Sequence, residues 1–380
     1  LSDGSVMQAV SSKNAESTPR PFGGIRSKPK RFAVIGAGMA GIACARTLVQ
    51  AGHDVTVFEQ HAEPAGRTAI VDSVCGSFDA GAQYFTVRDP RFQKALDTVP
   101  GLCRAWSANT VRVLDEAGRV VAAAPPPGER HWVAIPAMDA LVKTWAEPLS
   151  KNGQLLTNTP IASAERDVVS PHQWQLRSET PDGGTKVHAG FDTVLLAVPA
   201  PVAQAILGEH LALWEDALAK VETAPCWTLM LGFAHAVRPG LTTLGPQWNA
   251  ARSTHHRIAW LARESSKPGR SQVERWTVQA SPEWSAEHLN DDKARVQAKL
   301  TRAFSEVTGI RATPTFVDTR RWRFARTIMP LGQPALWDDA SQLGLCGDWC
   351  LGHRLEDAFI SGLELALASI DAAHSSKAFS

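Results

Sequence analysis

The stretch that decides the fold is "AVIGAGMAG", residues 33–41. Residues 31–35 predict a short buried strand, and Gly36, Gly38 and Gly41 follow it in a G-x-G-x-x-G pattern. In a nucleotide-binding unit of this kind, the first glycine permits a tight turn and the second lets the backbone approach a pyrophosphate. The third lets the next helix pack closely on the sheet. The free N–H groups at the start of that helix attract phosphates.

The residues after the glycines complete the pattern. Residues 39–51 predict a helix with Gly52 as its C-cap, and residues 55–58 predict a second strand. Glu59 ends this strand at the spacing where an acid accepts hydrogen bonds from an adenosine ribose and disfavours a 2′-phosphate. A glycine-rich turn without a ligand is the alternative. The two strands and the acid favour a nucleotide site, which also includes Gln60.

Two later segments indicate FAD as the nucleotide rather than NAD. In "PAGRTA", residues 64–69, Gly66 permits a turn and Arg67 can pair with the pyrophosphate. A surface arginine in a loop is the alternative for Arg67. In "CGDWC", residues 346–350, Asp348 ends the last predicted strand, where it can hydrogen-bond the ribityl chain or the flavin-side phosphate. Because the chain returns to the nucleotide with its last element, an extended FAD suits it better than NAD.

A final helix, predicted from Leu355 to Ala373, adds to this interpretation. Its positive N-terminal end would point at the flavin pyrimidine ring and stabilise the anionic reduced flavin. We predict that FAD is bound non-covalently, without a bond to Cys346 or Cys350. The predicted cofactor-binding residues are Gly36, Gly38, Met39, Ala40, Gly41, Glu59, Gln60, Gly66, Arg67, Gly81, Ala82, Gln83, Tyr84, Ile161, Gly347, Asp348, Glu356, Asp357 and Ala358.

The order of predicted elements indicates an α/β protein with two domains. One is a Rossmann-type FAD-binding domain, a parallel sheet with a β-meander formed by three short strands near 154–162, 172–178 and 185–188. The other is an inserted α+β substrate domain with a mixed or antiparallel sheet. The predicted ranges are 31–89, 153–204 and 317–378 for the FAD-binding domain, 90–152 and 205–316 for the substrate domain, and 1–30 for a flexible tail.

Composition limits the possible partners and compartments. The 380 residues carry a net charge of +1, which gives no electrostatic reason to expect nucleic acid or an anionic membrane as partner. The six cysteines lack zinc-ligand spacing, and we expect no metal. His255 and His256 are expected to be a surface or strand-edge pair rather than a metal site. We expect a cytoplasmic protein with a small-molecule substrate, with a transit peptide as the alternative for the tail; the oligomeric state is not predicted.

Several further segments resemble the bacterial renalase-like proteins, within the wider amine-oxidase flavoprotein superfamily. The resemblance runs from about residue 31 to 375, and the dinucleotide motifs alone specify only the superfamily. The resemblance is carried by "FDAGAQYFTVRDPRF", "WLARESSKPGR", "SPEWS", "RWRFART" and "GDWCLGHRLEDAFISG". Within these, "GAQYF", "SSKPGR" and "SPEWS" narrow it to the renalase-like branch. The resemblance implies an FAD-dependent oxidase that takes a hydride from its substrate and is reoxidised by oxygen, giving hydrogen peroxide. The implied substrates are the 2- and 6-dihydro isomers of reduced nicotinamide nucleotides.

Positions near the flavin are also predicted. Gln83, Tyr84 and Phe85 should lie near the isoalloxazine, with Trp322 of "RWRFAR" facing it from the other domain. His353 and Arg354, in the loop before the last helix, are further candidates. Ordinary packing or a solvated surface is the alternative for each of them. Lys267 and Arg270 either bind a substrate phosphate or lie in a solvated charged loop.

The catalytic residues are unknown, and Gln83, Tyr84, Trp322 and His353 are the substrate-pocket candidates. Dihydropyridines need little acid–base help, since positioning and the flavin supply most of the catalysis. Two alternatives stay open: an amine or other small-molecule oxidase or desaturase, and an idle protein that binds FAD and a nucleotide. No lysine that would hold a water near flavin N5 is assigned, which disfavours amine oxidation.

Overall fold

The computed structural model describes residues 28–107, 111–123, 129–235 and 245–375. Its central sheet has six strands in the order β19–β20–β13–β1–β2–β9. All neighbouring pairs are parallel except β19–β20. The strands are β1 (Arg31–Ile35), β2 (Asp54–Phe58), β9 (Leu155–Leu156), β13 (Thr193–Leu196), β19 (Leu336–Asp338) and β20 (Leu343–Leu345).

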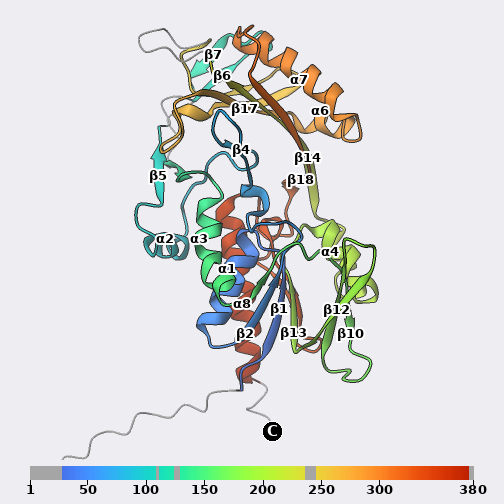
Figure 1. The fold of residues 1–380 in the computed structure, drawn as a ribbon. Coiled ribbons are helices and arrows are strands. Elements are labelled where there is room, and N and C mark those ends of the chain that lie inside the picture. Colours follow the sequence, from blue (N-terminus) through green and yellow to red (C-terminus); the bar gives the residue numbers. More distant parts are fainter. Residues whose placement is uncertain (1–27, 108–110, 124–128, 236–244, 376–380) are drawn as a thin grey trace, which may run out of the picture.

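Both faces of this sheet are covered, as its apolar strands require. Val34 packs in an apolar cluster with α1, α3 and α8. Its neighbours Ala33 and Ile35 pack in a second cluster on the opposite face, because side chains alternate along a strand. The helices on the first face are α1 (Met39–Gln50), α2 (Pro90–Asp97), α3 (Ala140–Lys151) and α8 (Leu355–Ser375) (Figure 1). The second face carries β10 (Ile161–Arg166), β11 (Trp174–Glu179), β12 (Thr185–Phe191), α4 (Ala200–Leu207) and α5 (Glu215–Leu218).

A second sheet has seven strands in the order β18–β14–β17–β16–β15–β6–β7 and is antiparallel except for the β15–β6 pair. Leu229 and Leu231 pack against α7 on its outer face, whereas Met230 packs against Phe78 and Ala80 on its inner face. The elements are β6 (Val111–Leu114), β7 (Val120–Ala123), β14 (Glu222–Phe233), β15 (Ala250–Ser253), β16 (Ile258–Arg263), β17 (Glu274–Ala280), β18 (Phe316–Met329), α6 (Pro282–Glu287) and α7 (Lys293–Thr308).

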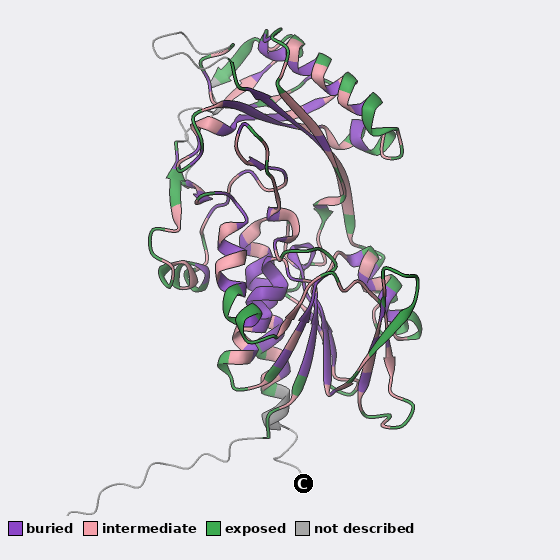
Figure 2. Cartoon of the chain, in the orientation of Figure 1, coloured by how far each residue is buried: buried purple, intermediate pink, exposed green. Residues whose placement is uncertain are grey.

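Two short antiparallel pairs lie between the large sheets (Figure 1). β3 (Ile70–Val71) pairs with β4 (Phe78–Asp79), and β5 (Cys103–Trp106) pairs with β8 (His131–Ala134). Buried residues follow the strands of both sheets and most of α1 (Figure 2). The segment that includes β4 is thus held between the two sheets by apolar contacts.

The predicted fold class is confirmed: a parallel Rossmann-like sheet and a separate mixed sheet are both present. β1 has the predicted bounds, and α1 ends at Gln50, so that Ala51 is the C-cap and Gly52 follows it with φ +87°. The predicted meander is β10–β12.

Two segments differ from the predicted division of the chain. β18 begins at Phe316 and belongs to the seven-stranded sheet, although residues 317–329 were assigned to the FAD-binding part. α3 was assigned to the substrate part, but its apolar side chains Leu141, Trp145 and Leu149 pack in the cluster that contains α1. Amphipathic periodicity predicts that a helix buries one face, not which neighbour covers it. Residues 1–27 of the predicted tail lie outside the described part of the chain.

Candidate functional site

The glycine turn after β1 has little room for side chains at two of its three glycines. Gly36 has φ +102°, and its N–H donates to the Phe58 carbonyl over 2.8 Å. A Cβ at Gly36 would overlap the Ala197 carbonyl oxygen, and one at Gly41 would overlap the Gly36 carbonyl oxygen. At Gly38 the nearest atom would be 3.6 Å away. Gly36 and Gly41 are therefore required by packing, while Gly38 leaves backbone accessible to a ligand.

Glu59 lies beside this turn and is 4% exposed. One carboxylate oxygen accepts from the Ala37 N–H over 2.9 Å, and the other accepts from the His61 N–H over 2.8 Å. Each oxygen keeps a second lone pair, so the carboxylate can also accept from ribose hydroxyls. The following Gln60 is exposed, and Met39 and Ala40 are buried in the first turn of α1.

Arg67 and Asp348 meet beside the same turn. A Cβ at Gly66 would lie 2.9 Å from the Gly38 Cα, so these two glycines are in close contact. The Arg67 guanidinium donates to both carboxylate oxygens of Asp348, and Thr327 in β18 donates to Asp348 over 3.2 Å. Two residues predicted to contact FAD therefore contact each other across 281 positions of sequence.

The two carboxylates in the first turn of α8 accept hydrogen bonds from backbone N–H groups of neighbouring segments. Glu356 accepts from the N–H groups of Arg88 and Asp89, each over 2.7 Å, and Asp357 accepts from the Arg354 N–H over 3.0 Å. Ala358 is buried, and the Gly347 N–H donates to the Ser361 hydroxyl over 3.0 Å. These contacts fix the position of the helix start beside Asp348.

His353 is exposed and lines a surface cavity of about 420 Å³ together with Thr327, Arg354 and Asp357. Its Nε2 lies 3.3 Å from a guanidinium nitrogen of Arg326. Partial burial, and then the charge of Arg326, lower the pKa of His353 below its ordinary value. The imidazole is therefore neutral at pH 7.

The turn at residues 81–84 lies between the glycine turn and the seven-stranded sheet. On one side, the Ala82 N–H donates to the Arg67 carbonyl over 2.9 Å. On the other side, the side chain of Gln279 in β17 donates to the Gly81 carbonyl over 2.8 Å. The indole of Trp322 in β18 donates to the Ala80 carbonyl over 2.9 Å. Two predicted residues, Trp322 and Gly81, are thus brought together with Arg67.

Tyr84 belongs to an aromatic cluster. Its ring stacks on His131 with centroids 4.0 Å apart, and the rings of Trp106 and Trp260 lie 6.4 and 5.8 Å away. Trp260 comes from β16 of the seven-stranded sheet, so the cluster spans both parts of the molecule. Phe85, predicted to lie near the flavin ring, is instead buried against Phe92 in the main core.

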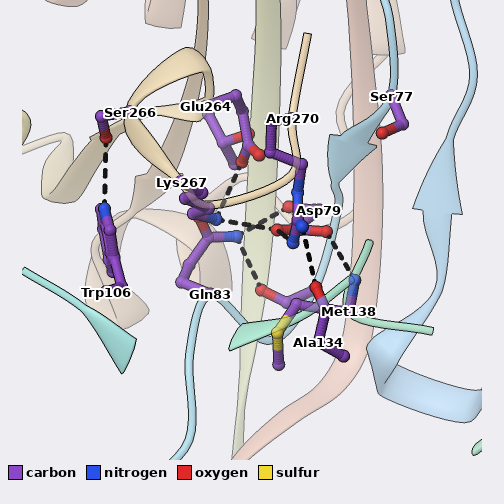
Figure 3. A network of polar contacts seen from close by, with 12 residues as sticks. Ser77, Asp79, Gln83, Trp106, Ala134, Met138, Glu264, Ser266, Lys267 and Arg270 are labelled. Carbon is purple, nitrogen blue, oxygen red and sulfur yellow. Dashed lines mark hydrogen bonds and ion pairs between the residues drawn. The ribbon is translucent and has the colours of Figure 1, made fainter. Parts of the chain in front are cut away.

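Lys267 and Arg270 fit neither predicted role. Their side chains are fully buried, and they bind carboxylates rather than water or a free anion (Figure 3). Lys267 donates to Asp79, Gln83 and Glu264 over 2.9, 3.2 and 3.1 Å, which uses all three of its N–H groups. Arg270 donates to Asp79 over 2.9 Å and to the Ala134 carbonyl over 2.7 Å. The phosphate-binding and solvated-loop interpretations are both wrong.

Sequence reasoning missed Asp79 and Glu264. Burial alone would raise the pKa of Asp79, but the charges of Lys267 and Arg270 outweigh it and hold that pKa below its ordinary value. Burial raises the pKa of Glu264, against the opposing effect of Lys267. The available signal was an acid in the otherwise apolar "SFDAGA", residues 77–82, since a buried acid needs a cation.

The remaining candidates are placed as follows. Ile161 begins β10 and packs against the apolar cluster on the second face of the central sheet. Burial raises the pKa of Cys350 to about 12, so its thiol is protonated at neutral pH. His255 pairs with Glu306 over 3.1 Å and is buried rather than on the surface. Among the described residues, no group of His, Cys, Asp or Glu side chains is arranged to hold a metal ion.

Comparison with known proteins identifies the family. Residues 34–99 match the NAD(P)-binding Rossmann-like domain, and residues 126–368 match the flavin containing amine oxidoreductases. The chain belongs to the flavin-containing amine oxidoreductase family. Within the described residues, no helix of the protein has the length and apolar character of a membrane span.

Two curated relatives share parts of the chain. A hydroxyneurosporene desaturase from Cereibacter sphaeroides is 42% identical over 59 residues, which are 16% of this chain and 12% of the relative. A bifunctional protein of tRNA 5-methylaminomethyl-2-thiouridine biosynthesis from Magnetococcus marinus is 32% identical over 209 residues, 46% of this chain and 30% of the relative. The chain therefore matches less than a third of the length of either relative.

A solved structure shares the fold. A protein from Exiguobacterium sp. 255-15, proposed to be a protoporphyrinogen oxidase, superposes with a TM-score of 0.69 at 13% identity. The match covers 90% of this chain and 99% of that chain. The renalase-like resemblance goes beyond these matches and stays a prediction.

The residues present fit the flavin that the family implies. Gly38 keeps an accessible backbone, and Glu59 and Asp348 offer buried carboxylates within one site. Backbone N–H groups suit a pyrophosphate, and carboxylates suit the hydroxyls of ribose and ribityl groups.

Proposed function

We propose that this protein is an FAD-dependent oxidoreductase that oxidises an amine or another small reduced molecule. The observation that carries the proposal is the position of the turn at residues 81–84. It contacts Arg67 of the dinucleotide site on one side and Gln279 and Trp322 of the seven-stranded sheet on the other. A cofactor and a substrate approaching from the two parts would meet at this turn.

Different residues of the chain would bind different parts of FAD. The backbone at Gly38 would hold the pyrophosphate, Glu59 the adenosine ribose and Asp348 the ribityl chain, without a covalent bond to Cys350. FAD, when bound, would supply the acceptor for the hydride and would return its electrons to oxygen as hydrogen peroxide. Amine oxidation and desaturation both need a hydride acceptor of this kind, and the family match and the desaturase relative support these two substrate classes.

The substrate side would be formed by the aromatic cluster around Tyr84. The rings of Tyr84, His131 and Trp260 pack together, with His131 and Trp260 buried and Tyr84 half-buried, and an aromatic wall of this kind would suit a planar or apolar substrate. Their role would be to orient the substrate and to exclude water, since a well-aligned hydride donor needs mainly positioning.

A second candidate is the oxidation of 2- or 6-dihydro-NAD(P), as in renalase-like proteins. It is favoured by one observation: Gln83 and the pair Lys267 and Arg270, from two segments that carry that resemblance, meet in one buried cluster. Gln83 belongs to the turn where the cofactor and substrate would meet, and Lys267 contacts it from the cluster.

One experiment separates these candidates. The purified yellow protein is mixed anaerobically with a panel of amines, with 2- and 6-dihydro-NAD(P) and with normal NADH, and the flavin absorbance is followed. Bleaching by amines supports the main proposal, and bleaching by the dihydro isomers alone supports the second candidate. Retained flavin that nothing bleaches indicates an idle FAD-binding protein. A protein that takes up no FAD overturns all of these interpretations.

A further inference from the structure

A buried ionic cluster joins three segments that are far apart in the sequence (Figure 3). Its centre is Asp79, at the end of β4, which accepts from Lys267 and Arg270 in the loop after β16. Asp79 also accepts from the Met138 N–H over 2.9 Å, at the segment before α3. The side chains of Asp79, Glu264, Lys267 and Arg270 are all fully buried. We refer to these four residues as the Asp79 cluster.

Stability alone is a poor reason for such a cluster. Removing four charges from water is costly, and well-packed apolar side chains of similar volume commonly give equal or greater stability. A buried ionic cluster is better explained where it specifies one arrangement among several. In this protein, the charges of the cluster select one orientation of a neighbouring polar side chain.

That group is the carboxamide of Gln83. A lysine ammonium only donates, so the Gln83 atom that faces Lys267 at 3.2 Å has to be the oxygen. The amide nitrogen is then forced to the other side, where it donates to the Asp79 carbonyl over 2.7 Å and to the Gly81 carbonyl over 3.0 Å. The charge on Lys267 thus selects the orientation of Gln83, and Gln83 in turn closes the turn at residues 81–84.

The backbone of the turn at residues 81–84 is restrained by further contacts. Gly81 accepts from Gln279, and Ala82 donates to the Arg67 carbonyl. A Cβ at Gly81 would overlap the Arg67 carbonyl oxygen, so the backbone of the turn lies directly on Arg67. A change in the Gln83 carboxamide would therefore shift Tyr84 and its aromatic neighbours rather than be absorbed by a loose loop.

We propose that Lys267 is a positioning residue that acts through Gln83 to fix the turn at residues 81–84 against bound flavin and substrate. The inference rests on the proposed function, which brings cofactor and substrate to this turn. Lys267 itself moves no proton and touches no substrate in this role. Asp79 and Glu264 accept hydrogen bonds from its ammonium group and fix its place.

The test uses the full-length FAD-loaded protein and four variants. Lys267→Met removes the ammonium, Gln83→Leu removes the carboxamide but keeps the ion pairs, and the double variant combines the two. Arg263→Met is the matched control, because Arg263 forms a buried ion pair with Glu274 in the same sheet and has no contact with the turn. Each variant is measured for thermal midpoint, visible circular dichroism of the bound flavin, and kcat and KM separately.

We expect Lys267→Met and Gln83→Leu to change the flavin spectrum in the same way and to lower kcat by on the order of 10- to 100-fold, with a smaller change in KM. The double variant should resemble each single variant, because both act on one group. Arg263→Met should lower the thermal midpoint and leave the spectrum and kcat unchanged. An unchanged spectrum and kcat in Lys267→Met would overturn the proposal.

Two further readouts keep the result decisive. If Lys267→Met does not fold, Gln83→Leu decides alone, since it leaves the Asp79 cluster intact: an unchanged flavin spectrum overturns the proposal. If the wild-type protein binds no FAD, the proposed function fails, and near-ultraviolet circular dichroism of the FAD-free variants still tests the positioning. Trp106, which hydrogen-bonds Ser266 and lies 5.3 Å from the Lys267 ammonium, and Tyr84 report on that arrangement.

Discussion

Three buried acids show how differently one side-chain type behaves in this molecule. Glu59 is surrounded by backbone N–H groups, and Asp79 by two cations and a backbone N–H. Glu264 accepts from one cation and from the Thr277 hydroxyl, and its second oxygen is unpartnered among the described residues. Only Glu59 was predicted from the sequence, because it stands at a fixed spacing from the glycines. Asp79 was not, because its partner Lys267 lies 188 positions away.

Replacing Glu59 tests the ribose assignment. Glu59→Gln loses one of two carboxylate acceptors and the negative charge, so FAD affinity should fall about tenfold to a hundredfold, the effect of losing a hydrogen bond to a charged group. The dissociation constant is measured by titration of FAD-free protein, followed by flavin fluorescence. The exposed Glu63→Gln is the control. An unchanged affinity in Glu59→Gln would mean that the ribose lies elsewhere.

Glu264 gives a dependence of stability on pH. Its pKa is raised in the folded protein, so the folded state holds this proton more tightly than the unfolded state does, and its contribution to stability falls as pH rises above about 4.3, the unfolded value. Glu264→Gln cannot ionise and lacks this loss. The free energy of unfolding of the variant minus that of the wild type should therefore increase between pH 4 and pH 8. A difference that stays constant in urea unfolding at both pH values would contradict the assignment.

At the level of elements, the glycines in the turn between β1 and α1 have two different roles. Gly36 and Gly41 are required by packing, and Gly38 leaves backbone accessible to a ligand. The sequence predicted this turn, both strands and the helix, because local spacing and apolar runs specify them. The contacts of the turn at residues 81–84 were harder to predict from the sequence, because Arg67, Gln279 and Trp322 come from segments that are far apart in the chain. Residues 316–329 mix charged and apolar side chains without a regular alternation, and only the pairing with β14 shows which sheet they join.

Two glycine substitutions test whether Gly41 is needed for packing and Gly38 for binding FAD. Gly41→Ala places a Cβ on the Gly36 carbonyl oxygen, which is backbone and cannot rotate away, so the thermal midpoint should fall by roughly 5–10 °C. Gly38→Ala has room in the fold, with the nearest atom 3.6 Å away, so it should keep its thermal midpoint and lose FAD affinity. Both are measured by thermal unfolding without FAD and by FAD titration. Equal loss of stability in the two variants would refute this distinction.

For the whole molecule, the two-sheet architecture was predictable from the order of strands and helices, whereas the boundaries were not. The attachment of FAD is a property that can be tested at this scale. Acid precipitation of the yellow protein should leave all flavin in the supernatant, because Cys350 has a pKa of about 12 and presents no thiolate for a covalent bond. A yellow pellet would show a covalent link and would overturn the predicted binding mode.

β18 also limits how the seven-stranded sheet can be exchanged between related proteins. Its 14 residues pair with β14 in the seven-stranded sheet, while Phe324, Ala325 and Thr327 contact Arg67 and Asp348 of the dinucleotide site. β18 is the edge strand of that sheet, so moving the sheet with it would remove the contacts to Arg67 and Asp348. Moving the sheet without it would expose the edge of β14, which invites aggregation. A new substrate preference would therefore be grafted more safely by exchanging side chains around Tyr84 than by swapping whole segments, and the two parts of the molecule are expected to evolve as one unit.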